Sequence, residues 1–220
     1  MELLWYGNWG RPVLAFPTSL GSAYQNEDCG LMEGLQPKID AGEIQVCCVD
    51  AIDNEHWYNQ GAHPGWKIHR YLQYARYLET EVIPLIRQKA QREDVVTFGA
   101  SFGAYHAMNF AGRFPHLVSR VVCFSGLYDI HRFLHGWWSD DCYFNNPSSY
   151  FPNLDGEALD RMRHIGFVVA TGEQDHLIGE NRWFAEMLAG KGLNVVGEFW
   201  PGVFGHDWPY WKGNLPRFVP

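Results

Sequence analysis

The sequence contains no apolar run that approaches the roughly 20 residues a membrane-spanning helix needs, so we expect no membrane span. Its first residues, from Met1 to Tyr6, lack both the basic segment and the long apolar segment of a signal peptide. Positive charge is scarce as well, because 17 Lys and Arg residues stand against 25 Asp and Glu, which gives a formal net charge of −8. A surface of that sign repels a phosphate backbone, so nucleic acid is not an expected partner.

Cysteines are few, and their spacing argues against the sites that cysteines usually form. Their number, five, is odd and does not suit a disulfide framework, and no two of them stand in a Cys-X-X-Cys pair that could hold zinc. His63 and His69 are six residues apart, so they would not share a helical face as metal ligands. We therefore predict that the protein holds no metal ion and is located in a reducing compartment, the cytoplasm.

Short apolar runs alternate with stretches of helical periodicity along the chain. The runs are nearly continuous, which is typical of strands covered on both faces. They occupy residues 12–16, 43–50, 94–99, 119–125, 166–171 and 195–200, and the first residues, from Met1 to Tyr6, also read as a strand. The helical candidates occupy residues 67–89, where Pro84 should introduce a kink, and residues 102–113, 157–163 and 179–188. This alternation predicts an α/β fold with a mainly parallel sheet and helices on both faces.

The length of 220 residues fits one α/β domain, and we expect residues 1–220 to form it without a large cap. One stretch interrupts the alternation, because residues 134–154 are rich in aromatic side chains, Asn and Pro. Loops of this length in compact domains are usually functional or mobile. This stretch is therefore a candidate wall for a binding pocket.

Residues 99–103, Gly-Ala-Ser-Phe-Gly, match the pattern Gly-X-Ser-X-Gly. The pattern alone is common, but here a strand candidate ends just before it and helical periodicity begins just after Ser101. A turn of this kind forces the serine backbone into a strained conformation and raises its hydroxyl above the sheet, while the flanking glycines leave room. We therefore predict that Ser101 is a nucleophile.

A serine hydroxyl is a weak nucleophile unless a base takes its proton, and that base is usually a histidine held by a buried carboxylate. In hydrolases with this turn the chain order is Ser, then Asp or Glu, then His after the last strand. Of the ten His residues, His206 alone follows the last strand candidate. His206 is the predicted base, whereas we expect His106, on the helix after the turn, to pack in the core or lie on the surface.

Four carboxylates compete to be the partner of His206. Asp175 follows the fifth strand candidate, past the carboxyl end where sites form in open parallel sheets, and is the favoured acid. Asp129 follows the preceding strand and remains an alternative, and Asp175 could instead cap the next helix. Glu173 lies two residues nearer the strand, and Asp207 adjoins His206 too closely for the two side chains to face one another.

Acyl transfer also needs hydrogen-bond donors for the oxyanion of the tetrahedral intermediate. One is expected from the backbone N–H of the residue after the nucleophile, Phe102, and the other from the loop after an early strand. That loop, residues 16–22, lacks the His-Gly-Gly-Gly run of many lipases. Ser19 or Leu20 could supply the second N–H, and Ser19 is favoured, but a plain turn is an alternative.

Three segments together resemble the putative esterase family of the α/β-hydrolase superfamily. They are Gly-Ala-Ser-Phe-Gly at 99–103, Gly-Glu-Gln-Asp at 172–175 and Gly-His-Asp-Trp-Pro-Tyr-Trp at 205–211. The chain is similar to the esterase-D-like, feruloyl-esterase-like and mycolyltransferase-like members over nearly its whole length. The resemblance implies an α/β-hydrolase fold, a triad of Ser101, Asp175 and His206, and no cofactor. The loop at 16–22 departs from the Asp-Gly or Ser-Gly form of several relatives, which leaves the second oxyanion donor open.

Hydrolysis of a small-molecule acyl ester through an acyl-enzyme is the leading functional prediction. The same triad would serve acyl transfer to an alcohol or amine, and a non-catalytic binding protein is the third possibility, which the complete triad disfavours. We expect the substrate pocket to be walled by aromatic side chains, although plain packing is an equal alternative. These are Trp57, Tyr58, Trp137, Tyr143 and Phe144. Nothing in the sequence indicates the oligomeric state.

Overall fold

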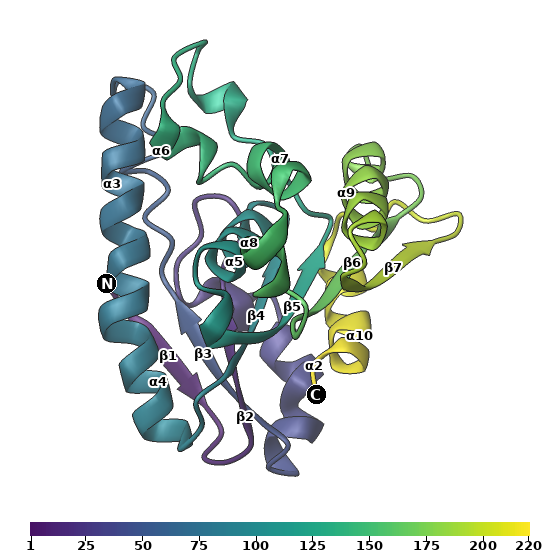
Figure 1. Cartoon of the computed structure of the whole chain (residues 1–220). Helices are drawn as coiled ribbons and strands as arrows, with labels where there is room; N and C mark the ends of the chain where they lie inside the picture. The colour runs from purple at the N-terminus through teal and green to yellow at the C-terminus, as the bar shows by residue number, and fades with distance from the viewer.

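The computed structural model describes residues 1–220 and contains a seven-stranded sheet with helices packed on both of its faces (Figure 1). The strand order is β1-β3-β2-β4-β5-β6-β7, and every neighbouring pair is parallel except β1 and β3. The strands are β1 (Leu3–Tyr6), β2 (Arg11–Ala15), β3 (Ile44–Val49), β4 (Val95–Ala100), β5 (Val118–Phe124), β6 (Gly166–Gly172) and β7 (Asn194–Trp200). The predicted α/β fold with a mainly parallel sheet is confirmed.

The helices connect these strands and leave no large cap on the sheet. The longer ones are α2 (Leu31–Asp40), α3 (Pro64–Tyr77), α4 (Ile83–Ala90), α5 (Phe102–Arg113), α9 (Ile178–Gly190) and α10 (Trp208–Phe218). The short ones are α1 (Gln25–Asp28), α6 (Asp140–Tyr143), α7 (Pro147–Tyr150) and α8 (Gly156–Asp160), with 3₁₀ turns at Pro115–Leu117, His131–Phe133 and Phe151–Asn153. No helix is both long and apolar enough to cross a membrane.

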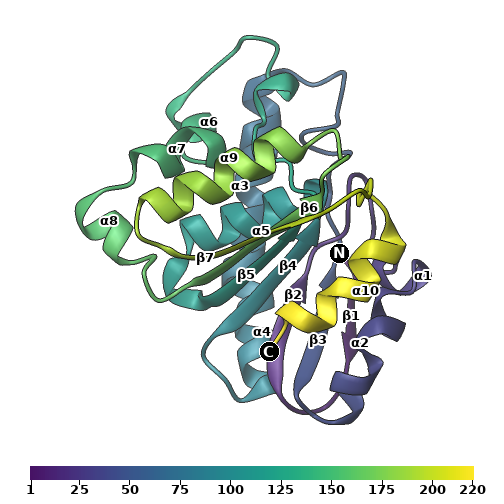
Figure 2. The same ribbon diagram turned by 90° about the vertical axis from the view of Figure 1, so that its right-hand side faces the viewer.

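The interior contains two hydrophobic cores, one on each face of the sheet, because successive side chains of a strand point to opposite faces. On β4, Val95 belongs to the core under α3, α5 and α9, whereas Val96 and Phe98 belong to the core under α2 and α10. Figure 2 shows the sheet edge-on between these two layers. Burial on both faces explains why the strand sequences are nearly continuously apolar.

The helix expected at residues 67–89 is interrupted rather than simply kinked. A π-helical turn, Leu78–Val82, lies between α3 and α4, and it ends two residues before Pro84. Proline has no N–H to donate and its ring crowds the preceding turn. A wider turn at this point lets the chain continue as a helix beyond the proline.

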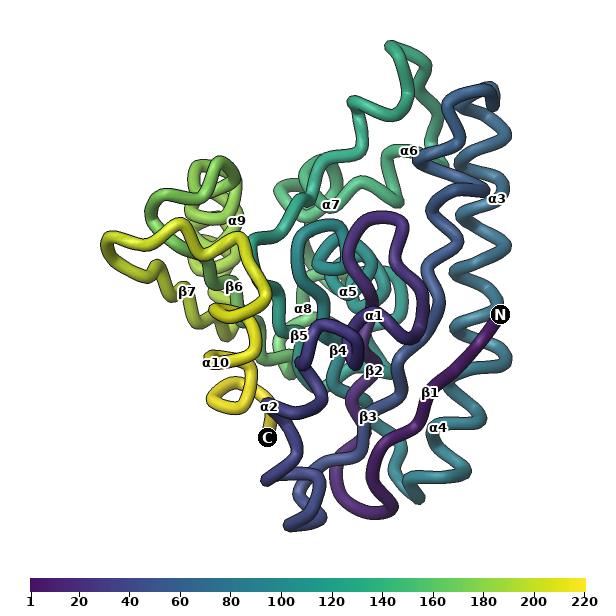
Figure 3. Tube along the Cα trace, turned by 180° about the vertical axis from the view of Figure 1, so that it is seen from behind, coloured from purple at the N-terminus to yellow at the C-terminus, as the bar shows by residue number.

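Two helices, α2 and α10, were not expected from the sequence. Each contains residues that usually end helices, namely Gly34 and Pro37 in α2 and Gly213 and Pro216 in α10. The two helices pack against one another and cover one face of the sheet, as the view from behind also shows (Figure 3). Burial of their apolar stripes therefore outweighs their poor intrinsic propensity.

Helix α5 lies unusually close to the loop after β2, and Gly103 makes this approach possible. A Cβ atom at Gly103 would lie 2.5 Å from the carbonyl oxygen of Pro17. A Cβ at Gly99 would in turn collide with the carbonyl oxygen of Gly103. Both glycines of the Gly-X-Ser-X-Gly pattern are thus required by close backbone packing at the end of β4.

We predict that Gly103→Ala lowers the free energy of unfolding by about 2 kcal/mol, since the rigid Pro17 backbone would have to move away. Gly213→Ala is the matched control, because no heavy atom outside its own helix lies within 4 Å of the added Cβ. That change should stabilise the protein by roughly 0.5–1 kcal/mol through helix propensity. Urea denaturation measures both, and equal effects of the two substitutions would contradict the close approach.

Candidate active site

Ser101 occupies the sharp turn between β4 and α5. Its φ of 53° and ψ of −120° lie in a region that non-glycine residues rarely adopt. The neighbouring strand holds this conformation, because the Ser101 N–H donates to the Phe124 carbonyl at 2.8 Å and the Leu127 N–H donates to the Ser101 carbonyl at 3.3 Å. The strained turn expected from the sequence is present, and the Ser101 side chain stands at the carboxyl edge of the sheet.

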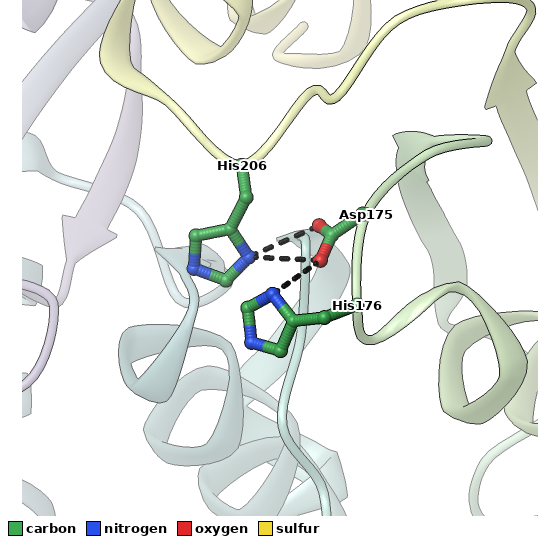
Figure 4. Close-up of side chains that lie close together, drawn as sticks. All are labelled: Asp175, His176 and His206. Carbon is green, nitrogen blue, oxygen red and sulfur yellow. Dashed lines mark hydrogen bonds and ion pairs between the residues drawn. The ribbon is translucent and has the colours of Figure 1, made fainter.

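The structure brings Ser101, His206 and Asp175 into one chain of hydrogen bonds. His206 Nε2 lies 3.1 Å from Ser101 Oγ, and His206 Nδ1 lies 3.0 Å from Asp175 Oδ2. An ionised carboxylate can only accept, so Nδ1 carries the ring proton and Nε2 is left to accept from the Ser101 hydroxyl. Figure 4 shows the imidazole of His206 directed at the carboxylate from a different loop.

Asp175 is buried and strongly hydrogen-bonded. Besides His206, the Thr171 hydroxyl donates to Oδ2 at 2.5 Å and the Leu177 N–H donates to Oδ1 at 2.9 Å. Burial by itself would raise the pKa of Asp175, but the hydrogen bonds from His206, Leu177 and Thr171 outweigh it and hold that pKa far below its ordinary value. The carboxylate therefore stays ionised opposite His206.

Ser125 connects this carboxylate to the rest of the fold, and no motif in the sequence marks it as a functional residue. Its Oγ lies 3.0 Å from Thr171 Oγ1, accepts from the Trp211 indole N–H at 3.2 Å and donates to the Gly205 carbonyl at 3.1 Å. Gly205 directly precedes His206. Ser125 thus links the end of β5, the end of β6, helix α10 and the His206 loop.

The three predicted oxyanion donors differ in what their amides already bind. The Leu20 N–H donates to Asp53 Oδ2 at 2.9 Å, and Leu20 has a positive φ of 60°. The N–H groups of Ser19 and Phe102 have no hydrogen-bond partner in the structure. The Ser19 hydroxyl accepts from Tyr58 at 2.7 Å, which fixes this loop beside the turn that carries Phe102.

A second buried acid, Asp53, holds that loop by accepting the hydrogen bond from the Leu20 N–H. Asp53 is fully buried, and its Oδ1 accepts from His106 Nε2 at 2.9 Å. His106 lies on α5, one and a half turns after Ser101, and is buried as well. His106 thus has the core position that was one of its two expected places, but its partner could not be recognised because Asp53 lies 53 residues earlier in the chain.

The five aromatic residues expected around the substrate separate into two places. Trp57 and Tyr58 line one cavity near Ser19, and Trp137 packs against His63 at the neighbouring end of α3. Tyr143 and Phe144 instead line a cavity with Gly112 and Arg113, at the far end of α5. That end lies roughly 16 Å along the helix from Ser101, since a helix rises 1.5 Å per residue. This position does not suit a pocket wall around Ser101.

Asp175, His176 and His206 are the residues whose donor atoms could together hold a metal ion, since these atoms lie within 4.8 Å of one another. His176, whose side chain is exposed, has its Nδ1 3.2 Å from Asp175 Oδ1 (Figure 4). A metal bound there would compete with the hydrogen bonds that Asp175 accepts from Thr171, Leu177 and His206. The arrangement therefore favours a hydrogen-bonded acid over a metal ligand.

The family model described as "Putative esterase" matches residues 20–220, nearly the whole chain. The match includes Ser101, Asp175 and His206 and agrees with the family resemblance of the three sequence segments. No curated protein matches the chain.

Solved structures share the fold at low sequence identity. A ferulic acid esterase is 19% identical, with a TM-score of 0.75 over 96% of this chain and 84% of that one. The S-formylglutathione hydrolase FrmB from Staphylococcus aureus is 16% identical, with a TM-score of 0.71 over 97% of this chain and 81% of that one. MPT51 (FbpC1) from Mycobacterium tuberculosis is 15% identical, with a TM-score of 0.65 over 99% and 93%. The chain therefore has the α/β-hydrolase fold that the resemblance implied.

Asp175 should make stability depend on pH at the acid end. Its pKa is depressed in the folded protein, so its contribution is present above the unfolded pKa of about 4 and is lost as pH falls toward the folded value. The difference in unfolding free energy between wild type and Asp175→Asn should shrink below about pH 4, by up to 1.36 kcal/mol per pH unit. Urea denaturation from pH 6 to 3 measures it, and a constant difference would contradict the depressed pKa.

Asp53→Ala should cost about 2–4 kcal/mol of unfolding free energy, because it removes the acceptor of the Leu20 N–H and of buried His106. Asp28→Ala, at an exposed position in α1, is the control and should change stability by less than about 0.5 kcal/mol. Thermal unfolding of the two variants compares them directly. A loss no larger for Asp53→Ala than for Asp28→Ala would show that the buried acid does not hold the loop.

Proposed function

The chain belongs to the putative esterase family and is a carboxylic ester hydrolase; we propose that Ser101, His206 and Asp175 form its catalytic triad. The observation that carries the proposal is the unbroken hydrogen-bond chain from the Asp175 carboxylate through His206 to the Ser101 hydroxyl. Its order matches the roles of acid, base and nucleophile in serine hydrolases. The substrate is a small-molecule ester.

In the proposed mechanism, Ser101 Oγ attacks the ester carbonyl carbon while His206 Nε2 takes the hydroxyl proton. The imidazolium that forms is stabilised by the ionised Asp175 carboxylate at Nδ1. Collapse of the tetrahedral intermediate breaks the carbon–oxygen bond to the alcohol, which leaves with the proton from His206, and an acyl-Ser101 ester remains. Water then attacks this ester with His206 again acting as base, which releases the acid and restores Ser101.

We assign the oxyanion hole to the backbone N–H groups of Phe102 and Ser19. Both groups lack a partner in the free protein, so they are available to a developing oxyanion, whereas the Leu20 N–H is already bonded to Asp53. Phe102 is also the first residue of α5, where the helix dipole adds positive potential. Such preorganised donors typically contribute about 2.7–4 kcal/mol each to the transition state.

The proposal also covers the domain organisation of the chain, its location and the walls of its pocket. We propose a single domain over residues 1–220 and a cytoplasmic location, the latter from the odd number and the spacing of the cysteines in the sequence. We propose Trp57, Tyr58 and Trp137 as pocket walls, whereas Tyr143 and Phe144 line a cavity at the far end of α5 and are not part of this proposal. No observation favours acyl transfer over hydrolysis.

A fluorophosphonate probe should label the protein once, at Ser101, and a short p-nitrophenyl ester should be cleaved. Ser101→Ala should remove the label and lower kcat by roughly 10⁶-fold, because the nucleophile is lost while the rest of the site remains. Intact-mass spectrometry and release of p-nitrophenol provide the two readouts.

Ser119→Ala is the matched control, since Ser119 lies near the amino end of β5, at the opposite edge of the sheet from Ser101, and its hydroxyl donates to the Val95 carbonyl at 3.4 Å. It should keep both the label and the wild-type rate. The triad proposal fails if folded Ser101→Ala keeps the wild-type rate, or if the probe modifies another residue.

A further inference from the structure

Lys67 is a buried cation without a carboxylate partner. Only three Asp, Glu, Lys or Arg side chains are buried in the structure: Asp53, Asp175 and Lys67. The two acids bond to His106 and His206, respectively. Lys67, which is 2% exposed, forms no ion pair and donates only to the carbonyl oxygens of Phe133 at 3.0 Å and Trp57 at 3.4 Å. Lysine is almost never fully buried without a counter-charge, so this ammonium group requires an explanation.

Lys67 lines a cavity of about 520 Å³, which is within the range of small-molecule sites. The lining includes Arg132 and His135 as well as Lys67, and it contains no Asp or Glu. Arg132 also forms no salt bridge, and its guanidinium lies over the ring of Phe133 at 4.8 Å. In a protein of net charge −8, this cavity thus gathers two cations that form no ion pair, although Glu180 lies near enough to Arg132 to interact with it electrostatically.

Acidic groups on the elements around the cavity are already bound elsewhere. Asp129 bonds to His131 at 2.6 Å, and Glu55 bonds to Arg70. Asp53 accepts from Leu20 and His106. Burial lowers the pKa of Lys67, and an anion in the cavity would raise it again by favouring the charged form. Glu180 acts on Arg132 from a distance but accepts from the Tyr128 N–H, and no acidic side chain lines the cavity itself.

The cavity adjoins the proposed oxyanion loop through Tyr58. The ring of Tyr58 lines the cavity, and its hydroxyl donates to Ser19 Oγ at 2.7 Å. The same ring packs edge-on against Phe102, with centroids 5.4 Å apart. In Figures 1 and 3, the segment between β5 and α6 lies beside the N-terminal end of α3, where Lys67 meets Phe133. A substrate on Ser101 therefore has a cationic cavity next to its oxyanion site.

We propose that this cavity binds a carboxylate group of the substrate, so that the enzyme prefers esters whose acyl or alcohol part carries a carboxylate. The inference rests on the proposed esterase function of Ser101. Lys67 supplies the buried charge, and the planar guanidinium of Arg132 supplies paired donors that suit a carboxylate. Low solvent access strengthens the attraction at Lys67 relative to a surface lysine.

The test compares pairs of esters that differ only in charge. One arm uses the mono-p-nitrophenyl esters of succinate, glutarate and adipate against their neutral methyl esters, which places the carboxylate in the acyl part at three lengths. The other arm uses 4-acetoxybenzoate against its methyl ester, which places the carboxylate in the alcohol part. In at least one pair, kcat/KM should be about 10-fold higher or more for the anion, the effect of one hydrogen bond to a charged group.

Lys67→Met and Arg132→Gln should each bring that ratio of kcat/KM close to one. Arg132 is exposed, so its variant remains informative if Lys67→Met does not fold. Arg76→Gln is the matched control, because Arg76 is an exposed arginine on α3 that forms no ion pair, and its variant should keep the wild-type ratio. This control removes any general effect of lowering the net charge.

The outcomes separate the two proposals. If both members of every pair are cleaved equally, or if the variants keep the wild-type ratio, the carboxylate site is wrong while the esterase triad stands. If no ester is cleaved and the fluorophosphonate probe fails to label Ser101, the triad proposal is wrong and the carboxylate inference falls with it.

Discussion

The buried carboxylate of Asp175 is the interaction on which the geometry of the site depends. It accepts hydrogen bonds from Thr171 at the end of β6, from Leu177 before α9, and from His206 in the loop after β7. Through Thr171 it also reaches Ser125, which bonds to Gly205 and to Trp211 of α10. An ion buried this deeply is tolerated only when its acceptor capacity is filled, so the loops that fill it are held in place together.

Asp53 plays a comparable structural part on the other side of Ser101. Asp175 fixes the loop of the proposed base, whereas Asp53 bonds the Leu20 amide and so fixes the loop that contains Ser19. The two acids lie after β3 and β6, on opposite sides of β4 in the sheet, and His106 bonds Asp53 to the helix α5 that begins after Ser101. The loops on both sides of Ser101 are therefore held by buried carboxylates, while its strained backbone is held by the hydrogen bonds with Phe124 and Leu127.

Local sequence was enough to predict the sheet and the triad candidates, because both follow from short-range patterns. Continuous apolar runs marked the strands, and the order Ser, Asp, His along the chain selected residues that the fold brings within hydrogen-bond distance. The helices α2 and α10 were not predicted because each contains Gly and Pro, which lower helix propensity. Their apolar stripes are stabilised only by the packing of the two helices against one another and the sheet. The pairing of Asp53 with His106, and the position of Tyr143, depend on contacts between distant segments that no local pattern records.

The three buried charged side chains differ in whether the protein itself supplies a partner for their charge. Each acid has a histidine and further donors, so its charge is satisfied when the protein is free. The ammonium group of Lys67 has carbonyl acceptors for its protons but no opposite charge, and an apolar side chain of similar size would avoid its desolvation cost. A residue that costs stability in the free protein is expected where function needs it. The open cavity beside Lys67, lined by Arg132 and free of acids, supplies the place where its missing counter-charge can bind.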